Sequence, residues 1–225
     1  MCGRFYQTYS SEELIVRYSA HSPLNPPQVQ RNSNFCPSQF GPVLYQDQNL
    51  ALPTWGWFRW GLIPSWSREE KIGFQMINAR SETVSEKPSF RQAFQKRRCV
   101  IPVNGFYEWK RSGSKKTPIA ISLKDDPIMS LAGIWEAWRS PDGRTLETFS
   151  ILTTSANSSL SPIHDRMPVI LNPSDEKTWL GNLSTHRTAI QALLKPCPSS
   201  WIRTQEVDPS TLKRLPKHPG TQEDT

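Results

Sequence analysis

The chain has 225 residues, enough to bury a substantial core within one domain. Its formal net charge of +7 favours a polyanionic partner, although a basic protein without such a partner would have the same composition. No run of about 18 apolar residues is present, so we expect no membrane span. The N-terminus lacks the basic and apolar regions of a signal peptide, so we expect a cytoplasmic protein.

The cysteines are scattered along the chain and form no Cys-x-x-Cys pair. They are Cys2, Cys36, Cys99 and Cys197. Such spacing is typical neither of a structural zinc site nor of a disulfide scaffold, and it suits a reducing compartment. We therefore expect no metal and no cofactor.

The sequence predicts many short strands and a few short helices. Ser10 and Glu13 form a capping box that opens a helix, and a polar, proline-broken loop follows over residues 21–39. Asn104-Gly105 is a dipeptide that type I′ turns prefer, so residues 99–103 and 106–110 are predicted to form a hairpin. Further helices are predicted at 88–97, 174–180 and 185–194, and further strands at 119–123, 129–135, 149–154 and 169–171.

This pattern predicts an α+β fold. We expect a single domain over residues 1–203, with a curved, mostly antiparallel and barrel-like sheet as its core and short helices at its flanks. Residues 204–225 are polar and contain three prolines, so we expect a loose C-terminal tail.

Cys2 is the first candidate for chemistry. Removal of Met1 would leave its α-amine and its thiol on neighbouring carbons. Such a 1,2-aminothiol condenses with an aldehyde to an imine, and the thiol then closes a stable thiazolidine ring. Both groups titrate near neutrality, at about 8 for the amine and about 8.5 for the thiol. Taken alone, the signal is weak, because a chain can begin with Met-Cys without using either group.

Three further polar residues stand out, each with an ordinary alternative. Asn78 follows an apolar segment and could simply cap a turn. Glu108 lies among Phe106, Tyr107 and Trp109, where desolvation would raise its pKa, but it could also be an exposed strand residue paired with Lys110. His164 precedes a predicted strand and could shuttle protons or make a structural hydrogen bond.

Three of these four residues are followed two positions later by an arginine, a pattern formed by Cys2 with Arg4, Asn78 with Arg80, and His164 with Arg166. Residues i and i+2 of an extended chain share a side, so each reactive group would have a guanidinium beside it. Arginine binds phosphate through paired hydrogen bonds, which suits chemistry on a nucleic-acid backbone. The alternative is three unrelated structural ion pairs.

Five segments in this order resemble the SRAP family, the SOS-response-associated peptidase-like proteins. They are Met1-Cys2-Gly3-Arg4-Phe5, Trp60-Gly61-Leu62-Ile63-Pro64-Ser65-Trp66, Ile77-Asn78-Ala79-Arg80-Ser81-Glu82-Thr83, Gly105-Phe106-Tyr107-Glu108-Trp109-Lys110 and Ile163-His164-Asp165-Arg166-Met167-Pro168. Two departures are visible. Ser33 stands where the family has Tyr in a Tyr-Asn-x-x-Pro segment, and the family's C-terminal segment is barely recognisable over residues 202–209.

The resemblance implies capture of abasic sites in single-stranded DNA as a thiazolidine, by a monomer without a metal. It implies that Cys2 is the nucleophile, that Asn78 and Glu108 are its catalytic neighbours, and that His164 opens the sugar ring. The DNA-binding residues would be Arg4, Arg80, Arg166, Trp66, Trp109 and Pro37.

Two other functions remain open from sequence. In a cysteine peptidase Cys2 would act as a thiolate with His164 as its base, and removal of Met1 would be the natural first reaction. A non-catalytic reader of single-stranded DNA would use the charge and the tryptophans but leave Cys2, Glu108 and His164 without a role.

Overall fold

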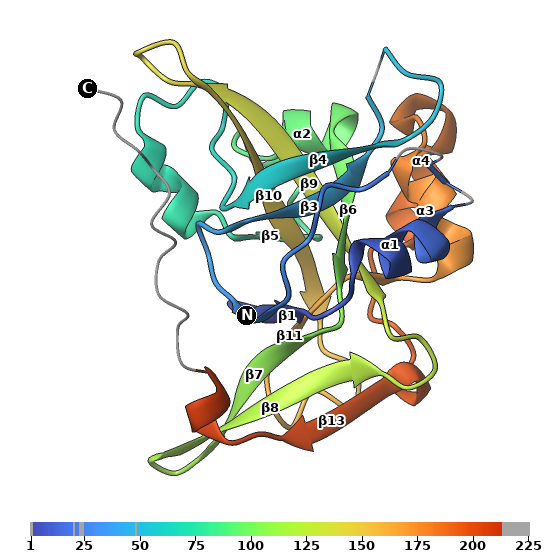
Figure 1. Cartoon of the computed structure of the whole chain (residues 1–225). Helices are drawn as coiled ribbons and strands as arrows, with labels where there is room; N and C mark the ends of the chain where they lie inside the picture. The colour runs from blue at the N-terminus through green and yellow to red at the C-terminus, as the bar shows by residue number, and fades with distance from the viewer. Residues whose placement is uncertain (1, 20, 23–24, 48, 213–225) are drawn as a thin grey trace.

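A closed barrel of five strands forms the centre of the molecule (Figure 1). The computed structural model describes residues 2–19, 21–22, 25–47 and 49–212. The barrel consists of β3 (Phe40–Tyr45), β4 (Thr54–Trp60), β6 (Arg98–Val103), β9 (Met129–Arg139) and β10 (Thr145–Ser155). It closes because β10 pairs with both β9 and β4. The β4–β10 pair is parallel, and the other neighbours in the barrel are antiparallel.

A second, fully antiparallel sheet packs against the barrel. Its order is β13 (Ile202–Glu206), β8 (Lys115–Leu123), β7 (Gly105–Ser112), β1 (Phe5–Gln7) and β2 (Asn32–Phe35). Three short strands, β5 (Asn78–Arg80), β11 (Arg166–Pro168) and β12 (Ile170–Leu171), extend the barrel strands. The predicted α+β fold with a curved, mostly antiparallel sheet is confirmed.

Short helices lie around the barrel, with α1, α3 and α4 together on one side of it (Figure 1). The α-helices are α1 (Ser11–Tyr18), α2 (Arg91–Lys96), α3 (Pro173–Leu180) and α4 (Leu183–Ala192). The 3-10 helices are η1 (Glu70–Gln75), η2 (Ser199–Trp201) and η3 (Pro209–Leu212). The predicted capping box at Ser10 and Glu13 is confirmed. Among the described residues, no helix is long and apolar enough to cross a membrane.

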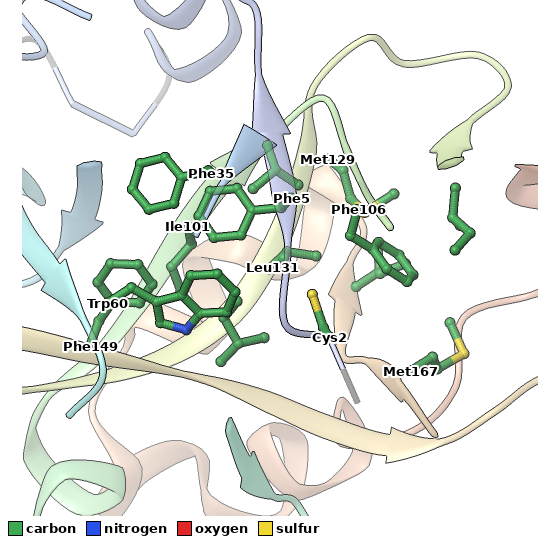
Figure 2. Packing of buried hydrophobic residues seen from close by; sticks show 14 of the residues in the cluster. Cys2, Phe5, Phe35, Trp60, Ile101, Phe106, Met129, Leu131, Phe149 and Met167 are labelled. Atoms are coloured by element: carbon green, nitrogen blue, oxygen red, sulfur yellow. The ribbon is translucent and has the colours of Figure 1, made fainter. Parts of the chain in front are cut away.

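The apolar core has two parts. One fills the barrel and the space beneath the second sheet, and it includes Phe5, Phe35 and Trp60 (Figure 2). The rings of Phe5 and Phe35 stack there with centroids 4.3 Å apart. The other part lies between the barrel and the helices, and it includes Tyr18 and Trp179. Burial on both surfaces of the barrel wall explains why strands such as β6 are buried along their whole length.

The predicted hairpin around Asn104-Gly105 is wrong. Strand β6 belongs to the barrel and β7 to the second sheet, and Asn104 lies where the chain passes from one to the other. Its side-chain oxygen accepts hydrogen bonds from the backbone N–H groups of Thr8 and Tyr9, at 2.6 and 3.0 Å. A dipeptide suited to a tight turn is used here to join two sheets.

Ordered structure continues beyond the expected domain end at residue 203. Strand β13 runs to Glu206 because its backbone pairs with β8, from Ile202 opposite Leu123 to Glu206 opposite Ile119. The η3 turn follows at Pro209–Leu212. Residues 213–225, the rest of the expected tail, lie outside the described residues. The predicted loop at 21–39 likewise contains strand β2.

Candidate functional site

The N-terminal segment is fixed beside β7 by backbone pairing. Phe5 lies opposite Phe106, and the N–H of Tyr107 donates to the carbonyl of Arg4 at 2.9 Å. This pairing places Cys2 next to the strand that carries Glu108. The Cys2 side chain is completely buried, and its sulfur points toward the apolar cluster in Figure 2. Met1, whose removal the sequence led us to expect, lies outside the described residues.

Asn78 reaches the same point from the barrel. It begins strand β5, which runs parallel to β10 with Asn78 opposite Ile151. Its side-chain N–H donates to the carbonyl of Cys2 at 2.8 Å. Its side-chain oxygen is buried and has no hydrogen-bond partner within the described part of the chain. The amide nitrogen of Asn78 is therefore fixed by the Cys2 carbonyl, while its amide oxygen remains available as a hydrogen-bond acceptor.

Glu108 is the third group at this point. It lies on β7 opposite Ile119, and only 6% of it is exposed, so the alternative of an exposed strand glutamate is wrong. Burial raises the pKa of the Cys2 thiol, and the negative charge of Glu108 raises it further. Both effects disfavour the thiolate, because a buried anion loses hydration and is repelled by a neighbouring carboxylate.

His164 lies at the mouth of the site, in the loop between β10 and β11. It lines a cleft of about 510 Å³ that Glu108 and Trp109 also line. Its Nδ1 accepts from the backbone N–H of Arg166 at 3.0 Å, and the Asp165 carboxylate lies 2.7 Å from the same nitrogen. These contacts exclude each other, because only a protonated Nδ1 can donate to Asp165. The two contacts therefore correspond to different positions of the ring proton.

The three arginines have different surroundings. Arg4 lies over the Trp109 ring, 5.3 Å from its centroid, and donates to the Leu212 carbonyl at 3.3 Å. Arg166 forms a two-pronged ion pair with Glu82, with contacts of 2.6 and 2.9 Å. Arg80 is exposed and forms no ion pair with any described residue. The shared i, i+2 spacing therefore does not give three equivalent guanidinium groups.

The structure separates the two tryptophans expected to contact DNA. Trp109 lies in the cleft with Glu108 and His164, whereas Trp66 is 61% exposed beside a second cleft of about 180 Å³, which Arg91 also lines. Pro37 is half-buried in the turn after β2. The larger cleft also contains Arg111 and Lys116, which the sequence analysis did not single out. No cluster of three or more potential metal ligands occurs among the residues that the structure describes.

The chain that forms this site is similar to a known protein family and to several named proteins. The family model described as SOS response associated peptidase (SRAP) matches residues 1–213. The abasic site processing protein YoqW of Bacillus subtilis is 41% identical over 220 residues, which cover 97% of this chain and 96% of that protein. The abasic site processing protein HMCES of Xenopus tropicalis is 31% identical over 68% of this chain and 54% of its own length.

A crystal structure of a protein from Bacteroides thetaiotaomicron superimposes with a TM-score of 0.81 at 30% identity, covering 95% of this chain and all of that one. The chain belongs to the SOS response associated peptidase (SRAP) family.

Proposed function

We propose that this protein processes abasic sites in single-stranded DNA by joining the sugar aldehyde to the amine and thiol of Cys2, once Met1 has been removed. Two relatives named as abasic site processing proteins support this proposal. The observation that carries it is the convergence of Asn78 and Glu108 on Cys2, in surroundings that are otherwise apolar. A buried cluster of polar groups is costly to a fold unless it serves a purpose.

The first steps open the sugar and form the imine. An abasic sugar is mostly a closed hemiacetal, and His164 at the mouth of the cleft is placed to move the protons that open it. The Cys2 amine then attacks the C1′ aldehyde to give a carbinolamine. Glu108, in its protonated form, protonates the departing hydroxyl, so that water leaves and a protonated imine remains, whose nitrogen keeps its hydrogen.

Ring closure returns the proton to Glu108. The Cys2 thiol adds to the imine carbon and gives its proton to the Glu108 carboxylate, so one carbon–sulfur bond forms and the acid is regenerated. The raised pKa of the thiol makes this transfer part of the step, because the sulfur begins protonated. Overall, aldehyde and aminothiol combine with loss of one water. Closure also removes the imine from which strand cleavage would proceed.

The same pKa argument weighs against a cysteine peptidase. A peptidase nucleophile needs a thiolate, which is usually favoured by a neighbouring positive charge. Burial and the charge of Glu108 instead raise the pKa of the Cys2 thiol, and they outweigh the opposite effect of the positively charged N-terminus. The four candidate residues are therefore better suited to aldehyde capture than to peptide hydrolysis.

The proposal is tested by intact-mass measurement after incubation with single-stranded DNA that carries one abasic site. We expect a chain that lacks Met1, and an adduct that survives denaturant with the mass of chain plus DNA minus one water. Cys2→Ala and an N-terminally extended chain should give no such adduct, and intact DNA should give none with the parent. Cys36→Ala, which changes another buried cysteine, is the matched control and should react as the parent does. A stable adduct with Cys2→Ala would exclude the mechanism.

A further inference from the structure

Two positive charges lie directly opposite each other on the β7–β8 hairpin. Arg111 pairs with Lys116 across the two antiparallel strands, and both side chains are exposed. Both line the cleft of about 510 Å³ that contains Glu108 and His164. Neither side chain forms a hydrogen bond or an ion pair with any residue of the described chain.

Like charges in directly opposite positions destabilise a strand pair, because their β-carbons are only about 5 Å apart. The cleft also contains the carboxylates of Glu108 and Asp165, but neither forms an ion pair with Arg111 or Lys116 in the described structure. Glu108 is buried beside Cys2, and the Asp165 carboxylate lies against His164. An anion bound between the two side chains would remove the repulsion, since a guanidinium and an ammonium on neighbouring strands can converge on one group.

The pair continues a row of groups suited to a nucleic-acid strand. Trp109 and Arg111 lie two positions apart on β7, so they share a face and stand about 7 Å apart along the strand. Arg4 lies over the ring of Trp109. Within the cleft, an aromatic ring is thus followed by two cations, an arrangement that suits a base and its neighbouring phosphate.

We propose that Arg111 and Lys116 form a phosphate-binding site that holds the DNA backbone one nucleotide away from the abasic sugar. This inference rests on the proposed function, since it places the strand in the cleft where Glu108 and His164 act. The ligand is a phosphodiester. It fixes the direction in which the strand leaves Cys2.

The test measures binding without chemistry. The probe is single-stranded DNA with one tetrahydrofuran residue, which mimics the closed abasic sugar but cannot form an aldehyde. Arg111→Gln/Lys116→Gln is compared with Lys177→Gln/Arg187→Gln, which removes the same two charges from exposed positions on α3 and α4. We expect the slope of log affinity against log salt to become shallower by about 0.7 in the hairpin variant, the value for one phosphate contact on a single strand. The α3/α4 variant should keep the parent slope.

The phosphate itself is located by changing the DNA. Single neutral methylphosphonate linkages are placed at each position on both sides of the tetrahydrofuran residue. One of them should weaken binding to the parent several-fold and leave binding to Arg111→Gln/Lys116→Gln unchanged, because the contact it removes is already absent. The position of this linkage identifies the side of the abasic site on which the strand runs along the hairpin.

Folding and the underlying function are checked separately. The melting temperature of the hairpin variant should equal or exceed that of the parent, since the substitution removes a repulsion. A parental salt slope in a folded hairpin variant, or equal methylphosphonate effects in both proteins, would overturn the phosphate site. Failure of the parent to form a covalent adduct with true abasic DNA would instead overturn the proposed function, and it is read from a different measurement.

Discussion

Asn78 is the residue whose role the structure defines most sharply. Its amide N–H holds the Cys2 carbonyl at 2.8 Å, and its oxygen is a buried acceptor without a partner in the described structure. An unused buried acceptor costs free energy, on the order of 1–3 kcal/mol. We infer that this oxygen orients the Cys2 amine or a hydroxyl of the opened sugar.

The relative crosslinking rates of two Asn78 variants test this role. Asn78→Ala removes both contacts and should slow crosslinking at saturating DNA about fivefold for each contact that matters in the transition state, because a hydrogen bond between neutral groups contributes roughly 1 kcal/mol. Asn78→Asp should be slower still, since its carboxylate cannot donate to the Cys2 carbonyl and adds a second negative charge near Glu108. Single-turnover rates give the comparison. An aspartate variant faster than the alanine variant would show that the oxygen matters and the N–H contact does not.

For individual residues, the sequence predicted part of the site. Cys2, Asn78 and Glu108 were selected by chemistry and by motif, and the structure brings them together. The i, i+2 pattern could not reveal that Glu82 pairs with Arg166, because Glu82 lies 84 residues away from it in the chain. Arg111 and Lys116 were missed for a similar reason, since a pair of opposed cations is visible only once the strand register is known.

Asn104 shows how one connecting residue positions the N-terminal segment. Besides accepting from the Thr8 and Tyr9 N–H groups, it donates to the Pro127 carbonyl at 2.8 Å. It therefore fastens the end of β1, the strand that leads back to Cys2. The hairpin prediction failed here because local turn preference says nothing about which sheet each flanking strand will join.

Two substitutions of Asn104 should distinguish the stabilising effect of its contact with Pro127 from that of its contacts with Thr8 and Tyr9. Asn104→Ala loses all three and should lower the free energy of unfolding by about 2 kcal/mol, since backbone groups are left without partners. Asn104→Asp keeps an acceptor for Thr8 and Tyr9 and should cost less. Denaturant titration gives both values, with Asn49→Ala in an exposed loop as the control. Equal losses for the two variants would mean that the Pro127 contact dominates.

In the molecule as a whole, the strands of the barrel contribute side chains to both parts of the apolar core. Its interior and the second sheet enclose the cluster that contains Cys2, and its outer surface carries the helices. The capping box and the short helices were predicted from sequence because those signals are local. Closure of the barrel was not, because it depends on β10 pairing with β4, about 90 residues earlier in the chain. Loss of the helical layer would therefore destabilise the barrel, whose strand β10 pairs with the strand that carries Asn78.

A buried ionic network fastens that layer. Glu176 of α3 is fully buried and accepts hydrogen bonds from Arg17 of α1 and from Ser130 of β9, both at 2.6 Å, while His21 lies 2.9 Å from its other oxygen. Burial alone would raise the pKa of Glu176, but the hydrogen bonds from His21, Arg17 and Ser130 together lower it below its ordinary value of 4.5. One side chain thus joins two helices to the barrel.

Replacing this carboxylate should produce a pH-dependent loss of stability. A carboxyl group whose pKa is lowered by folding stabilises the native state above its unfolded pKa, and that stabilisation disappears as pH falls through the folded value. At pH 7 we expect Glu176→Gln to lower the free energy of unfolding by about 3 kcal/mol, since it leaves the Arg17 charge without its buried partner. The difference in unfolding free energy between the parent and Glu176→Gln should shrink as pH falls below 4.5 and through the lowered pKa of the folded state. The parent carboxylate then becomes protonated and loses its charge. Glu86→Gln, at an exposed position, should differ little from the parent at any pH. Urea titrations of the three proteins across this range decide the matter, and a constant difference between parent and Glu176→Gln would show that the carboxylate acts through its shape rather than its charge.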